Sequence, residues 1–347
     1  MNNKNASIFA SLSKSTSICP KISDLVLGYR SAKILFTAVE LNLFEYLRKA
    51  PKSLKQITKH LSIDPRVGKF ILNALVSLNF LNKISKGYIN NSVSNQFLLK
   101  GSPDSFYHTL RYQNALYSSW SELTAIVKTG KPQKPLGEWL SNGMFTEDYI
   151  LTMLEIAKQP AKEIVSALSN HKTEKMLDVG AGPGMYSAGF LKKYPKLEVT
   201  LLDLPSTLIY TKKIHSQKNY ANRIRYIESS YHDADFPENQ YDLVLLSHVL
   251  HNEGEIENKE LLKKAFKSLR SNGKIAIHDF CLDKTECNPI FGALYSVHMS
   301  TYTEKGAAYR KDQFIKWLKD TGCTRIETYD ICRKTFNASN LMVGTKL

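Results

Sequence analysis

The chain has 347 residues, of which 43% are hydrophobic and 23% are charged, and its formal net charge is +15. This length is enough for two hydrophobic cores, and no apolar stretch is long enough to span a bilayer, so neither a single small domain nor a membrane protein is expected. The positive charge is scattered rather than gathered into one basic block, so nucleic acid is not the expected partner.

Residues 1–20 are polar and are interrupted by lysine and serine where a secretory signal would be apolar. They are predicted to form a flexible tail, and the protein is predicted to be cytoplasmic. The five cysteines are odd in number and none forms a C-x-x-C pair, which indicates neither a disulfide framework nor a zinc ribbon.

Residues 21–105 are predicted to form a helical domain. The segment DLVLGYRSAKILFTAVELNLFEYLRK carries apolar side chains at spacings of three, four and seven, which predicts one long helix. Two shorter helices follow, and alternation around Gly87 predicts a hairpin, which completes a winged-helix outline. The third helix offers only Arg66 and Lys69 as cations, so we expect the domain to bind another protein chain rather than DNA.

Residues 106–170 are predicted to be a helical connector, in which EDYILTMLEIAKQPAKEIVSAL forms one helix. From residue 171 onward, strands and helices alternate, and the strands are almost continuously apolar. This pattern predicts a mostly parallel sheet with helices on both faces. The final segments TRIETYDI and SNLMVGTKL are expected to pair antiparallel at its end. The expected fold class is α/β, with a Rossmann-like sheet ending in an antiparallel strand and a mostly helical winged-helix domain before it.

A glycine-rich turn follows the first strand of this sheet, in the sequence LDVGAGPG. In open α/β sheets, ligands bind beyond the carboxyl ends of the strands, and glycine lets a ligand approach the main chain closely. Gly180, Gly182 and Gly184 follow Asp178, whose negative charge disfavours a pyrophosphate. S-adenosylmethionine carries an ammonium and a sulfonium, so the turn favours this cofactor over a dinucleotide.

Asp203 ends the second strand, where a carboxylate can accept both hydroxyls of a ribose. Dinucleotide and adenosylmethionine sites share this feature. The full order of strand, acid, three glycines, helix, strand and terminal aspartate is more selective than any one part. A tight turn that holds no ligand is the alternative interpretation.

With these motifs, the chain resembles the small-molecule O-methyltransferases that join a winged-helix dimerisation domain to a class I methyltransferase domain. The group includes acetylserotonin, polyketide and plant phenylpropanoid enzymes. The resemblance runs from about residue 24 to the end, and it is carried by AKILFTAVELNLFEYL, FILNALVSLNFL, LDVGAGPGMYSAGFLKKYP, LLDLP and YDLVLLSHVLHNEGEIENKELLKKAFKSLRSNGKIAIHDF. It implies a homodimer through residues 21–105, an acceptor pocket partly formed by residues 106–170, and an S-adenosylmethionine domain over residues 171–347.

The resemblance also implies roles for single residues. His251 matches the family's catalytic base, and Asp279 matches an acidic position that steadies it. The predicted cofactor-binding residues are Asp178, Gly180, Gly182, Gly184, Asp203, Leu204, Ser229, Ser230 and Ser247.

Three positions depart from the family pattern. Ser229 and Ser230 replace a Gly-Asp pair whose aspartate meets the adenine amine, Asn252 and Glu253 replace Asp-Trp, and Ala308 replaces a second acid, leaving Glu304 as the nearest carboxylate. The adenine contacts and a plant-like pair of acids at the base are therefore open.

The chemistry of methyl transfer fits a histidine base. A phenol titrates near pH 10, so an imidazole with a pKa of about 6.5 can take its proton as the attack begins. His248 lies three positions before His251, but zinc needs further ligands at defined spacing, and only His278, Glu253 and Asp279 are at hand. No metal is predicted, and His248 and His278 are expected to be packing residues.

The segment FGALYSVHMSTYTEKGAAY is the expected wall of the acceptor pocket. The predicted substrate-binding residues are Met153, His298, Met299, Tyr302 and Thr303, with Tyr149 as a further candidate; each type is equally common as core packing.

The predicted activity is transfer of a methyl group from S-adenosylmethionine to a hydroxyl of a small, aromatic or conjugated acceptor. Because fold alone does not establish turnover, two alternatives stay open. One is an S-adenosylmethionine-binding enzyme of the same fold with a non-methylating, S-methylating or N-methylating outcome. The other is a winged-helix regulator that binds DNA.

Overall fold

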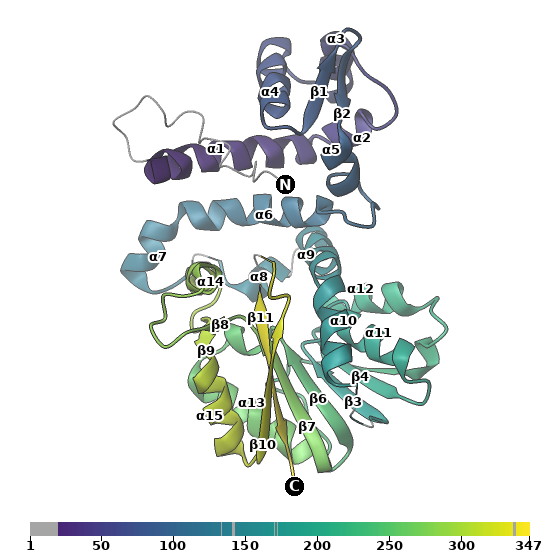
Figure 1. Ribbon diagram of the computed structural model, residues 1–347, viewed down its shortest axis with the longest axis vertical. Coiled ribbons are helices and arrows are strands. Elements are labelled where there is room, and N and C mark those ends of the chain that lie inside the picture. Colours follow the sequence, from purple (N-terminus) through teal and green to yellow (C-terminus); the bar gives the residue numbers. More distant parts are fainter. Residues whose placement is uncertain (1–19, 133, 141–142, 170, 172, 336–337) are drawn as a thin grey trace, which may run out of the picture. The chain divides into compact units, whose positions relative to one another are not determined.

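The computed structural model describes residues 20–347 except 133, 141–142, 170, 172 and 336–337 (Figure 1). The chain divides into two compact units, Met1–Tyr117 and Ser118–Leu347, with the boundary inside helix α6 (Tyr107–Ser121). The predicted tail over residues 1–20 lies almost wholly outside the described residues. In the described part of the chain, no helix combines the length and the apolar composition that a membrane crossing requires.

The N-terminal unit has the predicted winged-helix outline. Its elements are α1 (Pro20–Glu40), α2 (Leu43–Tyr46), α3 (Leu54–Leu61), α4 (Pro65–Ser77), β1 (Leu81–Ile84), β2 (Gly87–Asn90) and α5 (Ser92–Phe97). Strands β1 and β2 form the predicted antiparallel hairpin. The prediction of one long first helix is wrong, because Asn42 adopts a left-handed conformation (φ 54°) and separates α1 from α2. Asparagine is one of the few residues that tolerate this conformation.

The second unit contains a seven-stranded sheet in the order β10-β11-β7-β6-β3-β4-β5. The strands are β3 (Lys175–Val179), β4 (Glu198–Asp203), β5 (Ile224–Glu228), β6 (Tyr241–Ser247), β7 (Leu269–Asp279), β10 (Arg325–Ile331) and β11 (Ser339–Thr345). The five central and outer strands from β7 to β5 are parallel, whereas β11 runs antiparallel to both β7 and β10. The predicted fold class is confirmed. Because β3 has β4 on one side and β6 on the other, the strand order reverses beside β3, where open α/β sheets bind ligands.

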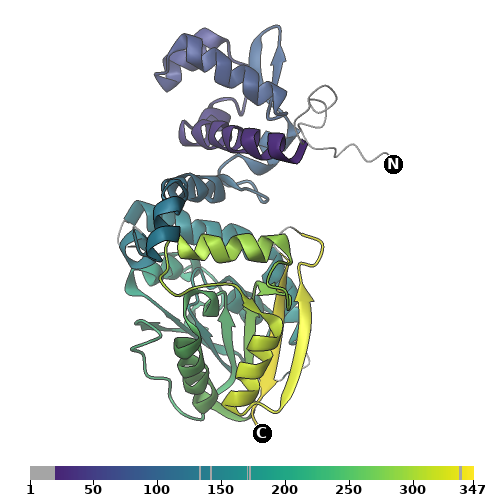
Figure 2. The ribbon, with the colours of Figure 1, turned by 90° about the vertical axis from the view of Figure 1, so that its left-hand side faces the viewer.

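Helices cover both faces of this sheet, as Figure 1 shows. One face packs against α10 (Lys158–Ala167), α11 (Met185–Lys193) and α12 (Pro205–His215), and the other against α13 (Glu255–Ser268) and α15 (Lys311–Thr321). Successive residues of a strand point to opposite faces, so Leu243 and Leu245 join the first core, while Val244 and Leu246 join the second. Both views place α14 (Ile290–Ser300) across the carboxyl ends of the parallel strands (Figure 2).

One further element boundary differs from the prediction. The helix expected over residues 147–168 is divided into α9 (Gly143–Ile156) and α10 (Lys158–Ala167), because Pro160 has no N–H and its ring conflicts with the carbonyl of residue 156. Strand β7 begins at Leu269, and its pairing with β6 shifts register between Tyr241 and Leu243. The remaining elements are α7 (Leu123–Thr129), α8 (Leu136–Leu140), η2 (Ala221–Arg223), η3 (Leu250–Asn252), β8 (Cys281–Leu282) and β9 (Tyr309–Arg310).

A substitution of Trp317 tests how much the core between the sheet and helices α13 and α15 contributes to stability. Its ring is buried, and it packs edge-on against Tyr309 at 4.9 Å and Phe314 at 5.4 Å. We expect Trp317→Ala to lower the free energy of unfolding by about 3–5 kcal/mol, because a large cavity replaces the ring. Chemical denaturation followed by circular dichroism measures this loss. Ile256→Ala, at an exposed position of α13, is the control and should change stability by less than about 0.5 kcal/mol.

Candidate active site

The glycine turn after β3 leaves open space at one position. Gly180 and Gly182 both have left-handed backbones, with φ of 64° and 53°. A Cβ at Gly180 would lie 2.7 Å from Cγ2 of Val249, whereas a Cβ at Gly182 would meet no described atom within 4 Å. Gly184, the N-cap of α11, packs closely against His215. Gly182 is therefore the glycine that leaves room for a ligand.

Asp203 ties this turn to the end of β4. Its Oδ2 accepts a hydrogen bond from the Gly182 amide at 2.8 Å, and its Oδ1 accepts one from the Leu204 amide at 2.7 Å. Burial raises the pKa of the carboxyl, although these hydrogen bonds oppose that shift. Each carboxylate oxygen can accept more than one hydrogen bond, so Asp203 keeps acceptor capacity for ribose hydroxyls.

Asp178 is less charged than the sequence suggests. It is buried beneath the turn, and the Ser187 hydroxyl donates to its Oδ2 at 2.6 Å. Burial, together with the nearby charge of Asp203, raises its pKa to about 7. The predicted attraction between Asp178 and a cationic cofactor stays a prediction.

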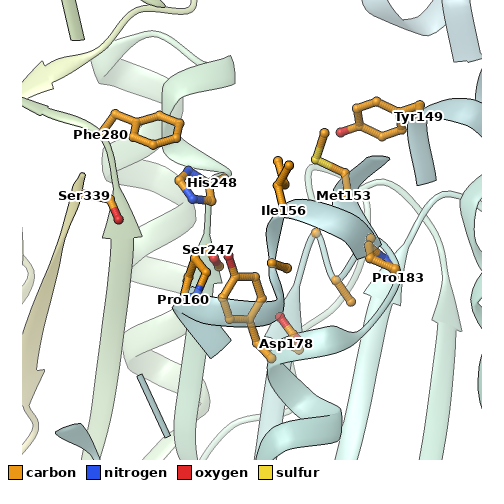
Figure 3. A pocket seen from close by; sticks show the side chains of 15 residues that line it. Tyr149, Met153, Ile156, Pro160, Asp178, Pro183, Ser247, His248, Phe280 and Ser339 are labelled. Atoms are coloured by element: carbon orange, nitrogen blue, oxygen red, sulfur yellow. The ribbon is translucent and has the colours of Figure 1, made fainter. Parts of the chain in front are cut away.

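Two cavities meet at the turn, with volumes of about 80 Å³ and about 420 Å³. Both are lined by Tyr149, Gly180, Gly182 and His248. In the first cavity, His248 and Phe280 lie across from Met153 and Ile156 of α9, as Figure 3 shows.

Most of the predicted cofactor-binding and substrate-binding residues line these cavities. The first cavity includes Met153, Asp178 and Ser247, and the second includes Asp203, Leu204, Ser229, Ser230, Tyr302 and Thr303. Five predicted residues are not part of either described lining, namely Gly184, His251, Asp279, His298 and Met299.

His251 and Asp279 form the predicted pair, next to the cavities. Nδ1 of His251 lies 2.7 Å from Oδ1 of Asp279, and both side chains are buried. Burial alone would raise the pKa of Asp279, but the neighbouring His251 and His248 outweigh it and lower this pKa. The amide of Phe280 also donates to Oδ1, at 2.9 Å. An ionised carboxylate only accepts hydrogen bonds, so Nδ1 of neutral His251 carries the proton and Nε2 keeps its lone pair.

His248 approaches the same oxygen of Asp279, with Nδ1 at 3.5 Å from Oδ1. Its backbone is left-handed (φ 57°), which is unusual outside glycine and directs the ring into both cavities. The ring packs against His278 at 4.4 Å and Phe280 at 4.5 Å, and burial lowers its pKa. His248 thus packs as predicted, but it also lines the ligand space.

His278 joins two serines beneath the first cavity. Its Nδ1 lies 2.8 Å from Oγ of Ser247, and its Nε2 lies 2.8 Å from Oγ of Ser339. Burial holds the pKa of His278 well below its usual range, so the ring is neutral. One serine therefore donates to the ring and the other accepts. Sequence reasoning missed Ser339, whose place in the cavity follows only from the pairing of β11 with β7.

His248, His251 and Asp279 are close enough to hold a metal ion, since their ligand atoms lie within 4.8 Å of one another. Within the described ranges, no further histidine, cysteine or carboxylate joins this group, and a structural zinc site takes four ligands. The hydrogen bond between His251 and Asp279 accounts for their positions without an ion. The absence of a metal stays a prediction.

Some residues of the predicted acceptor wall line a cavity, and others pack behind those residues. Tyr302 and Thr303 line the second cavity, whereas Met299 is fully buried and receives the Tyr302 hydroxyl on its sulfur at 3.1 Å. His298 stacks on Trp120 at 6.0 Å and meets Tyr302 edge-on at 5.0 Å. Met299 therefore supports the wall rather than forming its surface.

Tyr295 is the residue nearest the base that the sequence did not reveal. Its hydroxyl lies 3.2 Å from Nε2 of His251, the nitrogen that Asp279 leaves unused. Its ring packs against Phe280 at 4.8 Å and Phe291 at 5.8 Å. Only its position in the predicted wall segment, four residues before Met299, pointed toward the site.

Comparison with known proteins places this geometry in context. A family model described as an O-methyltransferase domain matches residues 120–324, and one described as an O-methyltransferase dimerisation domain matches residues 23–100. The chain is 26% identical over 331 residues to 3-hydroxy-5-methyl-1-naphthoate 3-O-methyltransferase of Streptomyces sahachiroi, covering 94% of each. It is 27% identical over 325 residues to acetylserotonin O-methyltransferase of Bos taurus, covering 87% of this chain and 93% of the relative. Its fold is similar to that of human N-acetylserotonin methyltransferase in complex with SAM, with a TM-score of 0.84 and 21% identity over 96% of this chain and 99% of the other.

His298 gives the wall a measurable pH dependence. Burial, and to a smaller extent the neighbouring His251, lower the pKa of His298 to about 4, against an ordinary value of 6.5. Between these values the unfolded chain binds a proton that the folded chain does not, so the free energy of unfolding falls as the pH falls. We expect His298→Asn to reduce the loss between pH 7 and pH 5 by about 2 kcal/mol, as measured by chemical denaturation. His60→Asn, at an exposed position, should leave that loss unchanged; an equal effect of both variants would contradict the assignment.

Proposed function

The chain belongs to the O-methyltransferase family and is an S-adenosylmethionine-dependent O-methyltransferase, and we propose that His251 acts as its general base on a small aromatic or conjugated acceptor. The family predicted from the sequence is confirmed. The observation that carries the proposed role of His251 is its short hydrogen bond to a buried, ionised Asp279, which leaves Nε2 able to take a proton.

The residues around the turn fit the cofactor. The open position at Gly182 gives bare main chain for a ligand to approach, and Asp203 offers carboxylate oxygens beside it. We propose that the adenosine end of the cofactor occupies the second cavity, against Leu204, Ser229 and Ser230. The methionine end then occupies the first cavity, near Asp178 and Ser247. Gly180 lines both cavities and shapes the turn between them. When bound, S-adenosylmethionine supplies an electrophilic methyl group on a sulfonium.

The acceptor is proposed from the walls of the site. Phe280, Tyr295, His298 and Tyr302 form a continuous group of rings beside the base. Flat rings favour edge-to-face and offset contacts with an aromatic ligand. The named relatives act on a hydroxynaphthoate and on acetylserotonin, which are also aromatic. Met153, Tyr149 and Thr303 complete the proposed acceptor pocket.

We further propose a homodimer formed through the N-terminal unit. Ile22, Leu25, Val26 and Tyr29 of α1 are each more than half exposed. An apolar surface of this kind marks a protein interface, and the dimerisation-domain match covers all of these residues except Ile22. In this proposal residues 21–105 dimerise, residues 106–170 contribute to the acceptor pocket, and residues 171–347 bind the cofactor. A cytoplasmic location stays a prediction.

Substitutions in the glycine turn distinguish an effect on protein stability from an effect on cofactor binding. Gly182→Ala places a methyl group in open space at a left-handed position, so we expect a stability loss of about 1 kcal/mol but a large loss of affinity for S-adenosylhomocysteine. Gly180→Ala adds the close approach to Val249 and should cost roughly 1–3 kcal/mol more. Denaturation and calorimetry measure the two effects. Unchanged affinity in folded Gly182→Ala would remove the turn from the proposed cofactor site.

His251→Gln tests the base. Incubation with labelled S-adenosylmethionine and a panel of phenols should give a methylated product with the unmodified protein. The variant should lower kcat by roughly 10²–10⁴, because the glutamine amide cannot take a proton. Its affinity for S-adenosylhomocysteine, measured by calorimetry, should change little, since His251 does not line either described cavity. A variant that keeps most of its kcat would contradict the proposed role.

A further inference from the structure

The working nitrogen of the proposed base is covered by a tyrosine. Nδ1 of His251 is bound to Asp279, so only Nε2 can receive a proton from an acceptor. The hydroxyl of Tyr295 lies 3.2 Å from that nitrogen. An acceptor must therefore either displace Tyr295 or act through it.

The direction of this hydrogen bond follows from the charge of Asp279. Because the buried carboxylate is ionised, Nδ1 carries the proton of neutral His251 and Nε2 carries a lone pair. The hydroxyl of Tyr295 is then the donor. A phenol oxygen that donates its proton still has lone pairs with which it can accept a hydrogen bond.

The ring of Tyr295 is held in place on several sides. It packs edge-on against Phe280 at 4.8 Å, lies parallel to Phe291 at 5.8 Å, and contacts His298 at 5.6 Å. Aromatic pairs in these arrangements stabilise the packing beyond the burial of their surface. Swinging the ring away would disrupt these contacts together, which disfavours displacement.

Tyr295 contacts both the base and residues that line the ligand space. The side chain of His251 is only 6% exposed, and it is not part of the described lining of either cavity. Two neighbours of Tyr295 do line them, Phe280 in the first cavity and Tyr302 in the second. Burial and the adjacent Tyr295 raise the pKa of Tyr302 well above its usual range, so Tyr302 stays protonated.

We propose that Tyr295 is a catalytic residue that relays the acceptor's proton to His251; this rests on the proposed role of His251 as the base. The acceptor hydroxyl gives its proton to the oxygen of Tyr295 while the Tyr295 proton passes to Nε2 of His251. The acceptor oxygen uses its lone pair to form a bond to the methyl carbon, the carbon–sulfur bond breaks, and its electron pair stays on sulfur. His251 becomes an imidazolium beside the Asp279 carboxylate, and Tyr295 ends the step as a neutral phenol.

This relay does not require a tyrosinate to accumulate. A phenol hydroxyl can donate one hydrogen bond while it accepts another, so the Tyr295 oxygen can take up the acceptor's proton as its own proton leaves. The cost of the transfer is therefore set by the imidazole, as in direct general base catalysis. An acceptor oxygen that is already ionised has no proton to pass, and it would not need the relay.

Tyr295→Phe tests this requirement with two acceptors. With a phenol that is neutral at the assay pH, kcat should fall roughly ten- to hundredfold. With a nitrophenol that is already ionised at that pH, kcat should stay within about twofold of the unmodified protein. The pH profile of kcat/KM for the neutral phenol should move toward alkaline pH in the variant, because activity then follows ionisation of the acceptor itself.

Phe291→Leu is the control for packing, since it disturbs the ring next to Tyr295 and keeps the hydroxyl. It should affect both acceptors alike and leave the pH profile in place. If Tyr295→Phe slows both acceptors equally, Tyr295 only packs, and the relay is overturned. If Tyr295→Phe accelerates the neutral phenol, the hydroxyl blocks the base, which also overturns the relay.

His251→Gln, measured in parallel, separates this proposal from the function on which it rests. If kcat with the neutral phenol is low in His251→Gln but unchanged in Tyr295→Phe, His251 is the base and the relay is rejected. If kcat is unchanged in His251→Gln, the proposed role of His251 as the base is rejected. Binding of S-adenosylhomocysteine by both variants, with unchanged circular dichroism, shows that each remains folded.

Discussion

The buried carboxylate of Asp279 determines the tautomer of His251. Its Oδ1 lies near the imidazoles of His251 and His248 and accepts the amide of Phe280, and these contacts keep the carboxyl ionised despite complete burial. An ionised acceptor fixes the tautomer of His251, and the tautomer in turn fixes which partner donates in the contact with Tyr295. Without that charge, either nitrogen of His251 could carry the proton. The Tyr295 hydroxyl would then not be fixed as the donor in its contact with His251.

The sheet brings this group together from distant parts of the sequence. Strands β6 and β7 are parallel neighbours, so their carboxyl ends bring the residues after Ser247 beside those around Asp279. The amide of His248 donates to the carbonyl of His278 at 2.8 Å, which holds the first turn after β6 against the end of β7. The glycine turn after β3 lies on the other side of β6. The order of the strands thus places the proposed cofactor site next to the proposed base.

The parts of the site that could be predicted from sequence are those that immediately follow strands. Gly182, Asp203 and His251 occupy such positions in recognisable motifs, and Asp279 follows from a family resemblance. Tyr295 and Ser339 could not be predicted, because their roles depend on a helix laid across the sheet and on a strand inserted from the end of the chain. The sequence also does not report the burial that raises the pKa of Asp178 to about 7.

The link through His278 also has a consequence for biosynthesis. Ser339 belongs to β11, which lies between β7 and β10, yet its hydroxyl completes the bonding of a histidine under the cofactor space. A nascent polypeptide that has released only β3 to β7 from the ribosome still lacks this serine. The first cavity therefore reaches its described lining only after β11 has been synthesised and has paired with β7.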